Sequence, residues 1–148
     1  MTDIRKIRDF LDQRRLAIVG VSREPMGFSR GVFHEFRNRG YDVAPVNPKA
    51  TEIEGQPCFA HLHDIEPPVD TALLLTPPAA TQAAVEECAA AGITRVWIYR
   101  VNNDAIRFCE SHGISVIAGE CPLMFLPQGA WFHRFHGFLR KIAGSYPR

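Results

Sequence analysis

The stretch Leu16-Ala17-Ile18-Val19-Gly20-Val21 indicates the fold of this chain. A short apolar run of this kind is typical of a strand buried in a parallel sheet. A loop over residues 22–28 follows, and residues 29–39 then show helical periodicity. We expect Ser29 to cap that helix and Gly40 to end it. A strand, a loop and a helix in this order predict the first part of a βαβ unit.

The same alternation continues along the rest of the chain. Further strands are expected over residues 41–46, 69–75, 96–99 and 114–118, and helices over residues 3–13, 79–91 and 103–112. Repeated βαβ units require right-handed crossovers. The fold class predicted is therefore α/β, a Rossmann-like parallel sheet of about five strands with helices on both faces. Ligands of such sheets bind outside the carboxyl ends of the strands, so the loops there should form one binding rim.

Composition limits the kinds of protein that this chain can be. Its 148 residues are expected to form a single domain over residues 1–148, with 46% hydrophobic and 22% charged residues. A net charge of +1 argues against a broad nucleic-acid surface. The chain has no apolar run of about 18 residues and no signal-peptide core, so neither a membrane span nor secretion is expected. Its four cysteines form no C-x-x-C pair, which favours a reduced, cytoplasmic protein.

The loop after the first strand carries Gly20-Val21-Ser22, with Arg23, Ser29 and Arg30 nearby. Glycine lets a backbone approach a pyrophosphate closely, and the start of the next helix supplies unpaired N–H groups and a positive dipole end. The loop departs from the G-x-G-x-x-G fingerprint, so an ordinary strand-to-helix turn explains the glycines as well. The arginines either add charge to a phosphate site or lie on the surface, which is the commoner place for a lone arginine.

The segment Val46-Asn47-Pro48-Lys49 ends the second strand, where a dinucleotide-binding unit usually carries an acidic residue for a ribose diol. Here the first carboxylate is Glu52, and Lys49 offers a cation instead. Ammonium and phosphate attract each other, so this position suits a ribose that carries a phosphate. Coenzyme A carries a 3′-phosphate there and NADP a 2′-phosphate. The alternative interpretation is a simple turn begun by Asn-Pro.

Two further segments end later strands. The two prolines of Thr76-Pro77-Pro78 offer a rigid, apolar surface without backbone N–H groups, suited to an adenine ring or a pantetheine arm, although proline is also common in a first helical turn. Glu120-Cys121-Pro122 places a thiol at the same rim. Cys121 is either a small buried hydrophobe, the commoner role, or the partner of a thiol ligand in a mixed disulfide.

Other residues give weaker indications of function. His61 and His63 could bind a metal ion together, but no third ligand is apparent in the sequence, and two loop histidines are the simpler interpretation. Aromatic residues recur at helical spacing over residues 130–143. We expect this C-terminal helix to pack on the sheet. A dimer contact is the second interpretation and a helix on a membrane surface the third.

Taken in order, these motifs resemble the CoA-binding domain family of small bacterial and archaeal proteins, a domain that also begins the alpha subunit of succinyl-CoA synthetase. The resemblance covers about residues 10–127. It implies that the first loop holds the CoA phosphates, that Lys49 meets the ribose phosphate, and that the cysteine segment lies towards the thiol. The coenzyme contacts implied are Gly20, Val21, Ser22, Arg23, Ser29, Arg30, Val46, Asn47, Pro48, Lys49, Thr76, Pro77, Pro78, Glu120, Cys121 and Pro122.

The chain departs from the synthetase in ways that bear on function. It has Tyr99-Arg100-Val101-Asn102 where the synthetase has a glycine-containing loop, and Glu120 where the synthetase has an amide. The phosphorylated histidine of the synthetase lies in a second domain that a chain of this length does not hold. The expected function is therefore binding of coenzyme A or an acyl-CoA without chemistry of its own. The alternatives are an NADP-dependent oxidoreductase and a module that recruits an acyl-CoA ligase partner, or a second copy, through the C-terminal helix.

Overall fold

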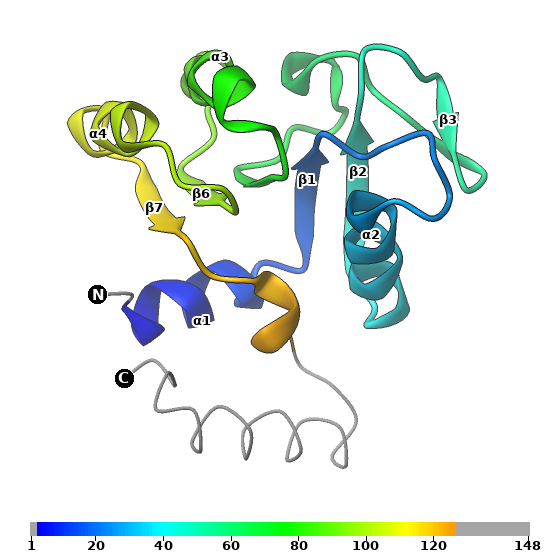
Figure 1. Ribbon diagram of the computed structural model, residues 1–148, viewed down its shortest axis with the longest axis horizontal. Coiled ribbons are helices and arrows are strands. Elements are labelled where there is room, and N and C mark those ends of the chain that lie inside the picture. The colour runs from blue at the N-terminus through cyan, green and yellow to red at the C-terminus, as the bar shows by residue number, and fades with distance from the viewer. Residues whose placement is uncertain (1–2, 127–148) are drawn as a thin grey trace.

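The structure is a computed structural model that describes residues 3–126 (Figure 1). The predicted C-terminal helix over residues 130–143 lies outside these residues. The α-helices and strands are α1 (Ile4–Asp12), β1 (Arg15–Val19), α2 (Phe28–Asn38), β2 (Asp42–Val46), β3 (Glu52–Ile53), β4 (Gln56–Pro57), β5 (Thr71–Leu74), α3 (Pro78–Ala90), β6 (Arg95–Ile98), α4 (Asn103–Ser111) and β7 (Ser115–Ala118). Two 3-10 turns complete the set, η1 (Leu62–Asp64) and η2 (Pro122–Met124).

Five parallel strands form the central sheet in the order β2-β1-β5-β6-β7. This confirms the predicted α/β, Rossmann-like class. The strand order reverses at β1, because the chain moves outwards to β2 and then returns to β5 on the other side of β1. A ligand crevice is expected outside the carboxyl ends of the strands at such a reversal point. In this molecule that point lies between β1 and β5.

Helices cover both faces of the sheet because alternate side chains of each strand point to opposite faces. Leu16 and Ile18 of β1 lie in one core cluster with residues of α1 and α2. Ala17 of β1 lies in the other cluster, with residues of α3 and α4. Figure 1 shows the same layers, with α1 and α2 on one side of the sheet and α3 and α4 on the other. Two apolar cores therefore hold the strand ends, and the loops that follow them, in a fixed arrangement.

Local differences from the sequence prediction concern α2 and the segment after β2. Helix α2 begins at Phe28 with Gly27 as its N-cap, so the prediction that Ser29 caps this helix was wrong. The segment expected to be only a turn-rich loop also contains the short antiparallel pair β3–β4. Pro45 lies within β2, which is tolerated because β2 is an edge strand of the sheet. No helix in residues 3–126 is both long enough and apolar enough to cross a membrane.

Candidate functional site

The predicted site residues lie in or beside loops at the carboxyl ends of the five parallel strands. Five strands leave four intervals between neighbours. At about 4.8 Å for each interval, the carboxyl ends of β2 and β7 lie about 19 Å apart. Lys49 and Cys121 follow these two strands, which are the two edges of the sheet. Only an extended ligand lying along this rim, which we call the carboxyl-end rim, could reach both.

Gly20 makes the tightest backbone approach at the reversal point. Its φ of +92° lies in the region that favours glycine, and a Cβ atom there would be 3.3 Å from the carbonyl carbon and oxygen of Leu75. Its N–H donates to the carbonyl oxygen of Val46 at 3.0 Å. The chain leaving β1 is thus held against the ends of both neighbouring strands. The sequence suggested Gly20 as a place where a ligand approaches the backbone. In the structure Gly20 also lets the chain pack closely against the backbone of Leu75.

Two serines close the loop between β1 and α2, one in the loop (Ser22) and one in the first turn of α2 (Ser29). Ser29 Oγ accepts a hydrogen bond of 2.8 Å from the backbone N–H of Ser22, and Ser22 Oγ accepts one of 2.9 Å from the N–H of Glu24. Gly27 supplies no side chain to cap α2. The first N–H groups of a helix have no partner within the helix, so this end offers donors and a positive dipole end to an anion. The fold thus brings Ser22 and Ser29 together, and both hydroxyls accept hydrogen bonds from backbone N–H groups of the loop.

Arg30 braces this loop from the first turn of α2. Its Nε atom pairs with Glu54 Oε2 at 3.2 Å, and its Nη1 donates to the carbonyl oxygen of Arg23 at 3.2 Å. Glu54 also contacts His34 Nδ1 at 3.3 Å and Arg37 Nη1 at 3.6 Å. Burial alone would raise the pKa of the Glu54 carboxyl, but the hydrogen bonds and charges of His34 and Arg30 lower it below its ordinary value. The Arg30 charge is therefore already shared with a carboxylate.

Asn47 joins the loop after β2 to the loop after β1. Its Nδ2 donates to the carbonyl oxygen of Val21 at 2.8 Å, and its Oδ1 accepts from the N–H of Lys49 at 2.8 Å. This turn leaves Pro48 and Lys49 exposed at the carboxyl-end rim, whereas the Val46 side chain is buried in the core. Among the described residues, the Lys49 ammonium has no hydrogen-bond or ion-pair partner. It is available to a ligand in a way that Arg30 is not.

The loops after β5 and β6 are also joined. Thr76 Oγ1 and Thr81 Oγ1 are 2.7 Å apart, which fixes the turn into α3 and leaves Pro77 and Pro78 exposed. Asn102 Nδ2 donates to the carbonyl oxygen of Pro78 at 2.9 Å, and its Oδ1 caps the start of α4. Sequence reasoning placed Asn102 on the rim but assigned it no role. An asparagine that caps a helix through its side-chain oxygen still has its NH2 group to donate, and this was the signal for the contact with Pro78.

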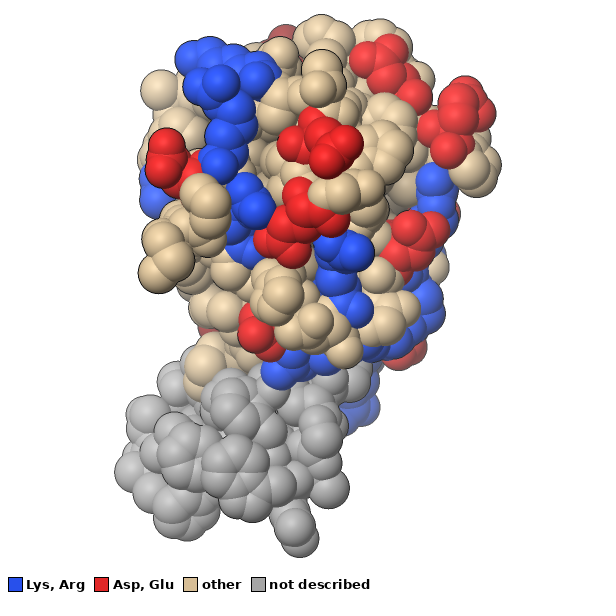
Figure 2. Space-filling model, turned by 90° about the vertical axis from the view of Figure 1, so that its right-hand side faces the viewer, with Lys and Arg blue, Asp and Glu red and all other residues tan. Residues whose placement is uncertain are grey.

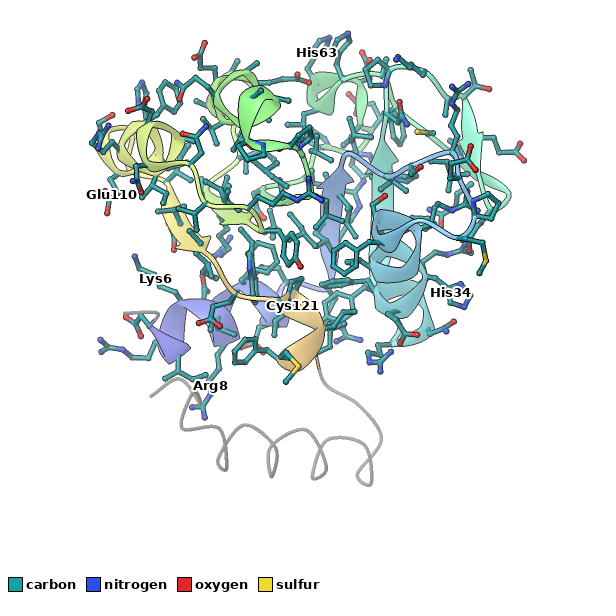
Figure 3. The ribbon with its side chains drawn as sticks, viewed as in Figure 1. Lys6, Arg8, His34, His63, Glu110 and Cys121 are labelled. Carbon is teal, nitrogen blue, oxygen red and sulfur yellow. The ribbon has the colours of Figure 1, made fainter. Side chains whose placement is uncertain are left out.

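The last predicted segment lies at the far end of the carboxyl-end rim. The carbonyl oxygen of Glu120 accepts a hydrogen bond of 2.9 Å from Trp97 Nε1. Cys121 is half-buried at the start of η2, where Figure 3 shows it just beyond the end of β7, and Pro122 is buried. Burial raises the pKa of the Cys58, Cys88 and Cys109 thiols. In these three cysteines burial therefore favours the thiol over the thiolate.

An aromatic contact at the rim was missed by sequence reasoning. The rings of Phe28 and Tyr99 stack with centroids 5.0 Å apart and an interplanar angle of 30°. Phe28 opens α2 and Tyr99 follows β6, so the pair spans the end of β5. Both residues flank predicted elements, but their contact depends on how the loops are placed across the sheet, and the sequence carries no signal for it.

Among the described residues, the histidines do not gather into a metal centre. His61 and His63 flank the start of η1 with ring centroids 5.3 Å apart, and they pair with Glu87 at 3.6 Å and Asp64 at 3.3 Å respectively. His34 lies on α2, well away from His63 (Figure 3). Within residues 3–126 no three His, Cys, Asp or Glu side chains are arranged as metal ligands.

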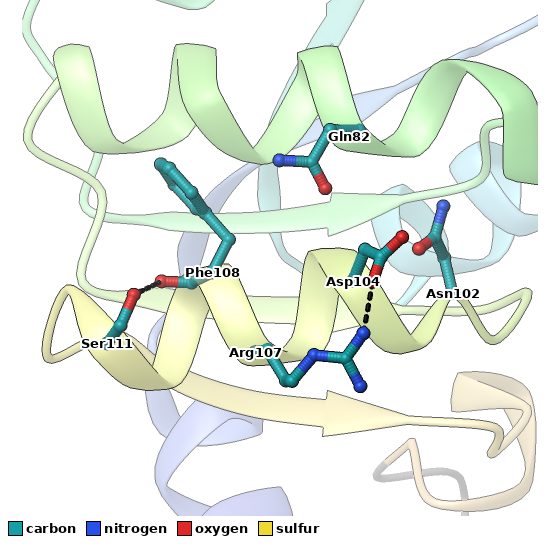
Figure 4. Close-up of a pocket in the computed structure, with 6 residues that line it drawn as sticks. All are labelled: Gln82, Asn102, Asp104, Arg107, Phe108 and Ser111. Carbon is teal, nitrogen blue, oxygen red and sulfur yellow. Dashed lines mark hydrogen bonds and ion pairs between the residues drawn. The ribbon is translucent and has the colours of Figure 1, made fainter.

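Two other surfaces lie away from the rim loops that carry the predicted residues. A groove of about 570 Å³ runs between α3 and α4 and is lined by Gln82, Asn102, Asp104, Arg107, Phe108 and Ser111 (Figure 4). It touches the rim only at Asn102. Basic and acidic side chains are interspersed on the face that carries α2 and β3 (Figure 2). This mixture, with the net charge of +1, is unlike the single-sign surface of a nucleic-acid-binding domain.

Comparison with known proteins identifies a family model and relatives that match this chain in sequence. The family model described as CoA binding domain matches residues 14–127. The ADP-forming acetate–CoA ligase of Methanocaldococcus jannaschii is 24% identical over 118 residues, which cover 73% of this chain and 17% of the ligase. This chain thus spans about a sixth of the length of that relative.

Two proteins of similar size match over most of their length. The uncharacterised protein YneT of Bacillus subtilis is 27% identical over 119 residues, which cover 78% of this chain and 88% of YneT. The structure of a hypothetical protein from Pyrococcus horikoshii OT3 superposes with a TM-score of 0.76 at 30% identity, covering 80% of this chain and 86% of the other.

Proposed function

This chain belongs to the CoA binding domain family, and from that premise we propose that it binds coenzyme A or an acyl-CoA along the carboxyl-end rim. The observation that carries the proposal is the exposed Lys49 ammonium, which has no partner among the described residues and follows the strand beside β1. A cation at this place suits a phosphorylated ribose. The 3′-phosphate of coenzyme A is the group that we assign to Lys49.

The rest of the coenzyme is assigned by charge and polarity along the carboxyl-end rim. The uncapped start of α2 is proposed to hold the pyrophosphate through backbone N–H groups, with Arg23 as an exposed cation beside it. The exposed faces of Pro77 and Pro78 are proposed to line the adenine or the pantetheine arm. The thiol end would then point towards Cys121, at the opposite end of the rim from Lys49.

The groups on the carboxyl-end rim are suited to holding a ligand, and we assign no bond-making step to them. They are a free ammonium, helix N–H groups, hydroxyls already bonded within the loops, and proline rings. This chain matches about a sixth of the length of the Methanocaldococcus jannaschii ligase, and the rest of that ligase has no counterpart in the matched region. We propose that this chain presents or senses the coenzyme, and any transfer of an acyl group would take place on a partner.

Thermal unfolding against a panel of ligands tests this function. The panel is coenzyme A, dephospho-CoA, NADP and NAD. A ligand at about 100 times its dissociation constant stabilises the fold by about 2.7 kcal/mol, which for a protein of this size raises the melting temperature by roughly 5–10 °C. The proposal predicts a shift with coenzyme A that is smaller with dephospho-CoA. A shift with NADP alone would instead support an oxidoreductase, and no shift with any ligand would contradict coenzyme binding by this chain.

A further inference from the structure

The two edges of the central sheet differ in how they are closed. At the β2 edge, the backbone of Phe59 pairs with the strand. Its N–H donates to the carbonyl oxygen of Pro45 at 2.9 Å, and its carbonyl oxygen accepts from the N–H of Asn47 at 2.9 Å. Pro45 itself has no N–H to offer at this edge. Edge strands are commonly protected by a proline or by a covering segment, and β2 has both.

The β7 edge has neither form of protection among the described residues. β7 is the last strand of the sheet and pairs only with β6. The N–H groups of Ser115 and Gly119 donate to β6 at 2.9 and 3.1 Å. Backbone groups alternate in direction along a strand, so the N–H and C=O groups of Val116 and Ala118 point away from β6. Within residues 3–126 nothing bonds to these outward groups, and such an edge is a template for another strand.

A groove of about 350 Å³ gives access to this open edge. It is lined by residues 116–118 of β7 and by Ile106 of α4, which are apolar, and by the charged side chains of Asp3, Lys6 and Glu110. Figure 3 shows Lys6 on α1 and Glu110 on α4, on opposite sides of β7. The edge therefore combines backbone donors, backbone acceptors, apolar side chains and charges of both signs. A surface of this composition is complementary to a copy of itself.

We propose that the β7 edge is an interface between two copies of this chain, in which β7 pairs antiparallel with β7 of the second copy. Facing residues in antiparallel strands exchange both of their hydrogen bonds at alternate positions. A two-fold axis at Ile117 sets Val116 of each copy opposite Ala118 of the other. Every outward N–H and C=O of these two residues then has a partner. The same surface serves both copies, as a two-fold interface requires.

The charges beside the edge fit the same arrangement. The two-fold axis is perpendicular to the sheet, so α1 of the second copy runs antiparallel to α1 of the first on the same face. Asp3 and Lys6 lie about one turn apart at the start of α1, which lets Lys6 of each copy approach Asp3 of the other. An extended peptide of another protein could pair with the same backbone groups. A second copy supplies the reciprocal charges as well, and it is therefore the occupant that we assign.

This inference does not rest on coenzyme binding, and the two are compatible. Strand direction reverses across the two-fold axis, so the carboxyl-end rims of the two copies lie at opposite ends of the joined sheet. Pairing through β7 uses the side of the strand and not its carboxyl end. Each copy in the dimer therefore keeps its own rim open to a ligand.

Sedimentation of the full chain across a dilution series tests the inference. Wild type should have twice the monomer mass at high concentration and should dissociate on dilution. Ala118→Pro removes an outward N–H and adds a ring at the edge, which is the arrangement that Pro45 already has in β2, so this variant should fold. It should raise the dissociation constant at least about tenfold, because the two-fold axis doubles each loss. Circular dichroism on heating checks that it is folded.

A charge reversal on α1 tests the interface without altering the sheet. Lys6→Glu places a carboxylate near the partner's Asp3 and should raise the dissociation constant by about two- to fivefold. Arg8→Glu is the matched control. It makes the same change of charge at an exposed position of α1 that does not line the groove, where Figure 3 shows the side chain directed away from β7, and it should leave association unchanged.

Amide hydrogen exchange measured by NMR identifies the surface that is covered. In the proposed dimer, exchange at Val116 and Ala118 slows as the protein concentration rises, whereas Ser115, which donates to β6, exchanges slowly throughout. A chain that stays monomeric at every concentration would overturn the inference. A dimer that Ala118→Pro and Lys6→Glu both leave intact would also overturn it, because the copies would then associate through another surface, such as residues 130–143.

Discussion

Glu54 is the residue whose role differs most from what its sequence position suggests. It lies in the turn between β3 and β4 with a φ of +50°, and its carboxylate gathers Arg30, His34 and Arg37 from α2. Arg30 in turn donates to the carbonyl oxygen of Arg23 in the proposed phosphate loop. A single carboxylate thus positions a loop that it does not itself touch.

The first prediction concerns this brace. Glu54→Ala should lower the free energy of unfolding by about 1–2 kcal/mol, because Arg30 and its neighbours lose a partly buried charged partner. It should also weaken coenzyme A binding, since the loop before α2 is held less firmly. Urea unfolding and calorimetry measure the two effects. Glu52→Ala, an exposed change in the same hairpin, should stay within about 0.5 kcal/mol of wild type. Equal effects of the two variants would show that the ion pairs of Glu54 do not stabilise the loop.

The second prediction is the pH dependence of the same group. The pKa of the Glu54 carboxyl is lowered in the folded protein, so the folded state binds fewer protons there than the unfolded state. Its contribution to the free energy of unfolding is therefore complete above the unfolded-state pKa of about 4.3, and it is lost as the pH falls through the folded-state pKa. The difference in unfolding free energy between wild type and Glu54→Ala should shrink as urea titrations move from pH 7 to pH 3. A difference that grows towards low pH would contradict the assigned direction.

At the scale of elements, the reversal point depends on how closely β1 approaches β5. Gly20 at φ +92° lets the chain leave β1 against the backbone of Leu75. Gly31 differs in its surroundings, because it lies within α2 and a Cβ atom there would meet nothing within 4 Å. The two glycines are therefore a matched pair for separating backbone packing from helix propensity.

The third prediction follows from this pair. Gly20→Ala should destabilise the protein by about 1–3 kcal/mol, because alanine is strained at this φ and its Cβ crowds the neighbouring backbone. Gly31→Ala should instead stabilise it by up to about 1 kcal/mol, the usual gain in an exposed helix interior. Urea unfolding of both variants checks the signs. Destabilisation by Gly31→Ala, or a neutral Gly20→Ala, would show that the assigned backbone geometry is wrong.

Most of the helices and strands are predictable from the sequence, for a physical reason. Buried strands such as β1 and β5 read as apolar runs, and glycines such as Gly40 end helices, because burial and left-handed backbone are local requirements. The start of α2 was misplaced because Ser29 bonds back to Ser22, which competes with its use as a cap. The β3–β4 pair and the Phe28–Tyr99 stack were missed, since two-residue strands and contacts between distant loops leave no periodic pattern.

The candidate site also has a part that the sequence predicts and a part that it does not. The loops that form it follow from strand order, and every predicted residue lies on or beside one of them. What each side chain does depends on its partners in space, as Arg30 and Lys49 show: both are cations near the reversal point, but only Arg30 is paired among the described residues. The sequence favoured Lys49 as a phosphate contact and left Arg30 as either a phosphate contact or a surface residue, but it carried no signal for the Arg30–Glu54 pair.

At the scale of the whole molecule, two apolar clusters cover the two faces of one sheet, and buried thiols report on one of them. Cys88 of α3 and Cys109 of α4 lie fully inside the cluster on the α3–α4 face. Burial raises the pKa of the Cys109 thiol to about 11 and raises that of Cys88 further above its ordinary value. Neither thiol should react until the cluster opens.

The fourth prediction uses these thiols as a measure of global stability. Alkylation of Cys88 and Cys109, followed by mass spectrometry at pH 8, should be slow in the native protein and rapid in urea. Acetyl-CoA, whose own sulfur is blocked, should slow labelling about a hundredfold at 100 times its dissociation constant if labelling requires global unfolding. Unchanged labelling with a ligand that calorimetry shows to bind would mean that α3 and α4 open locally.

Calorimetry of coenzyme A and dephospho-CoA with wild type and Lys49→Ala tests the central claim most directly. Lys49 is exposed, so a solvent-screened ion pair with the 3′-phosphate should change the affinity by about fivefold. We predict that wild type binds coenzyme A more tightly than dephospho-CoA, and that Lys49→Ala removes this preference with little change in dephospho-CoA binding. An equal loss for both ligands, or an unchanged preference for coenzyme A, would show that Lys49 does not read the ribose phosphate.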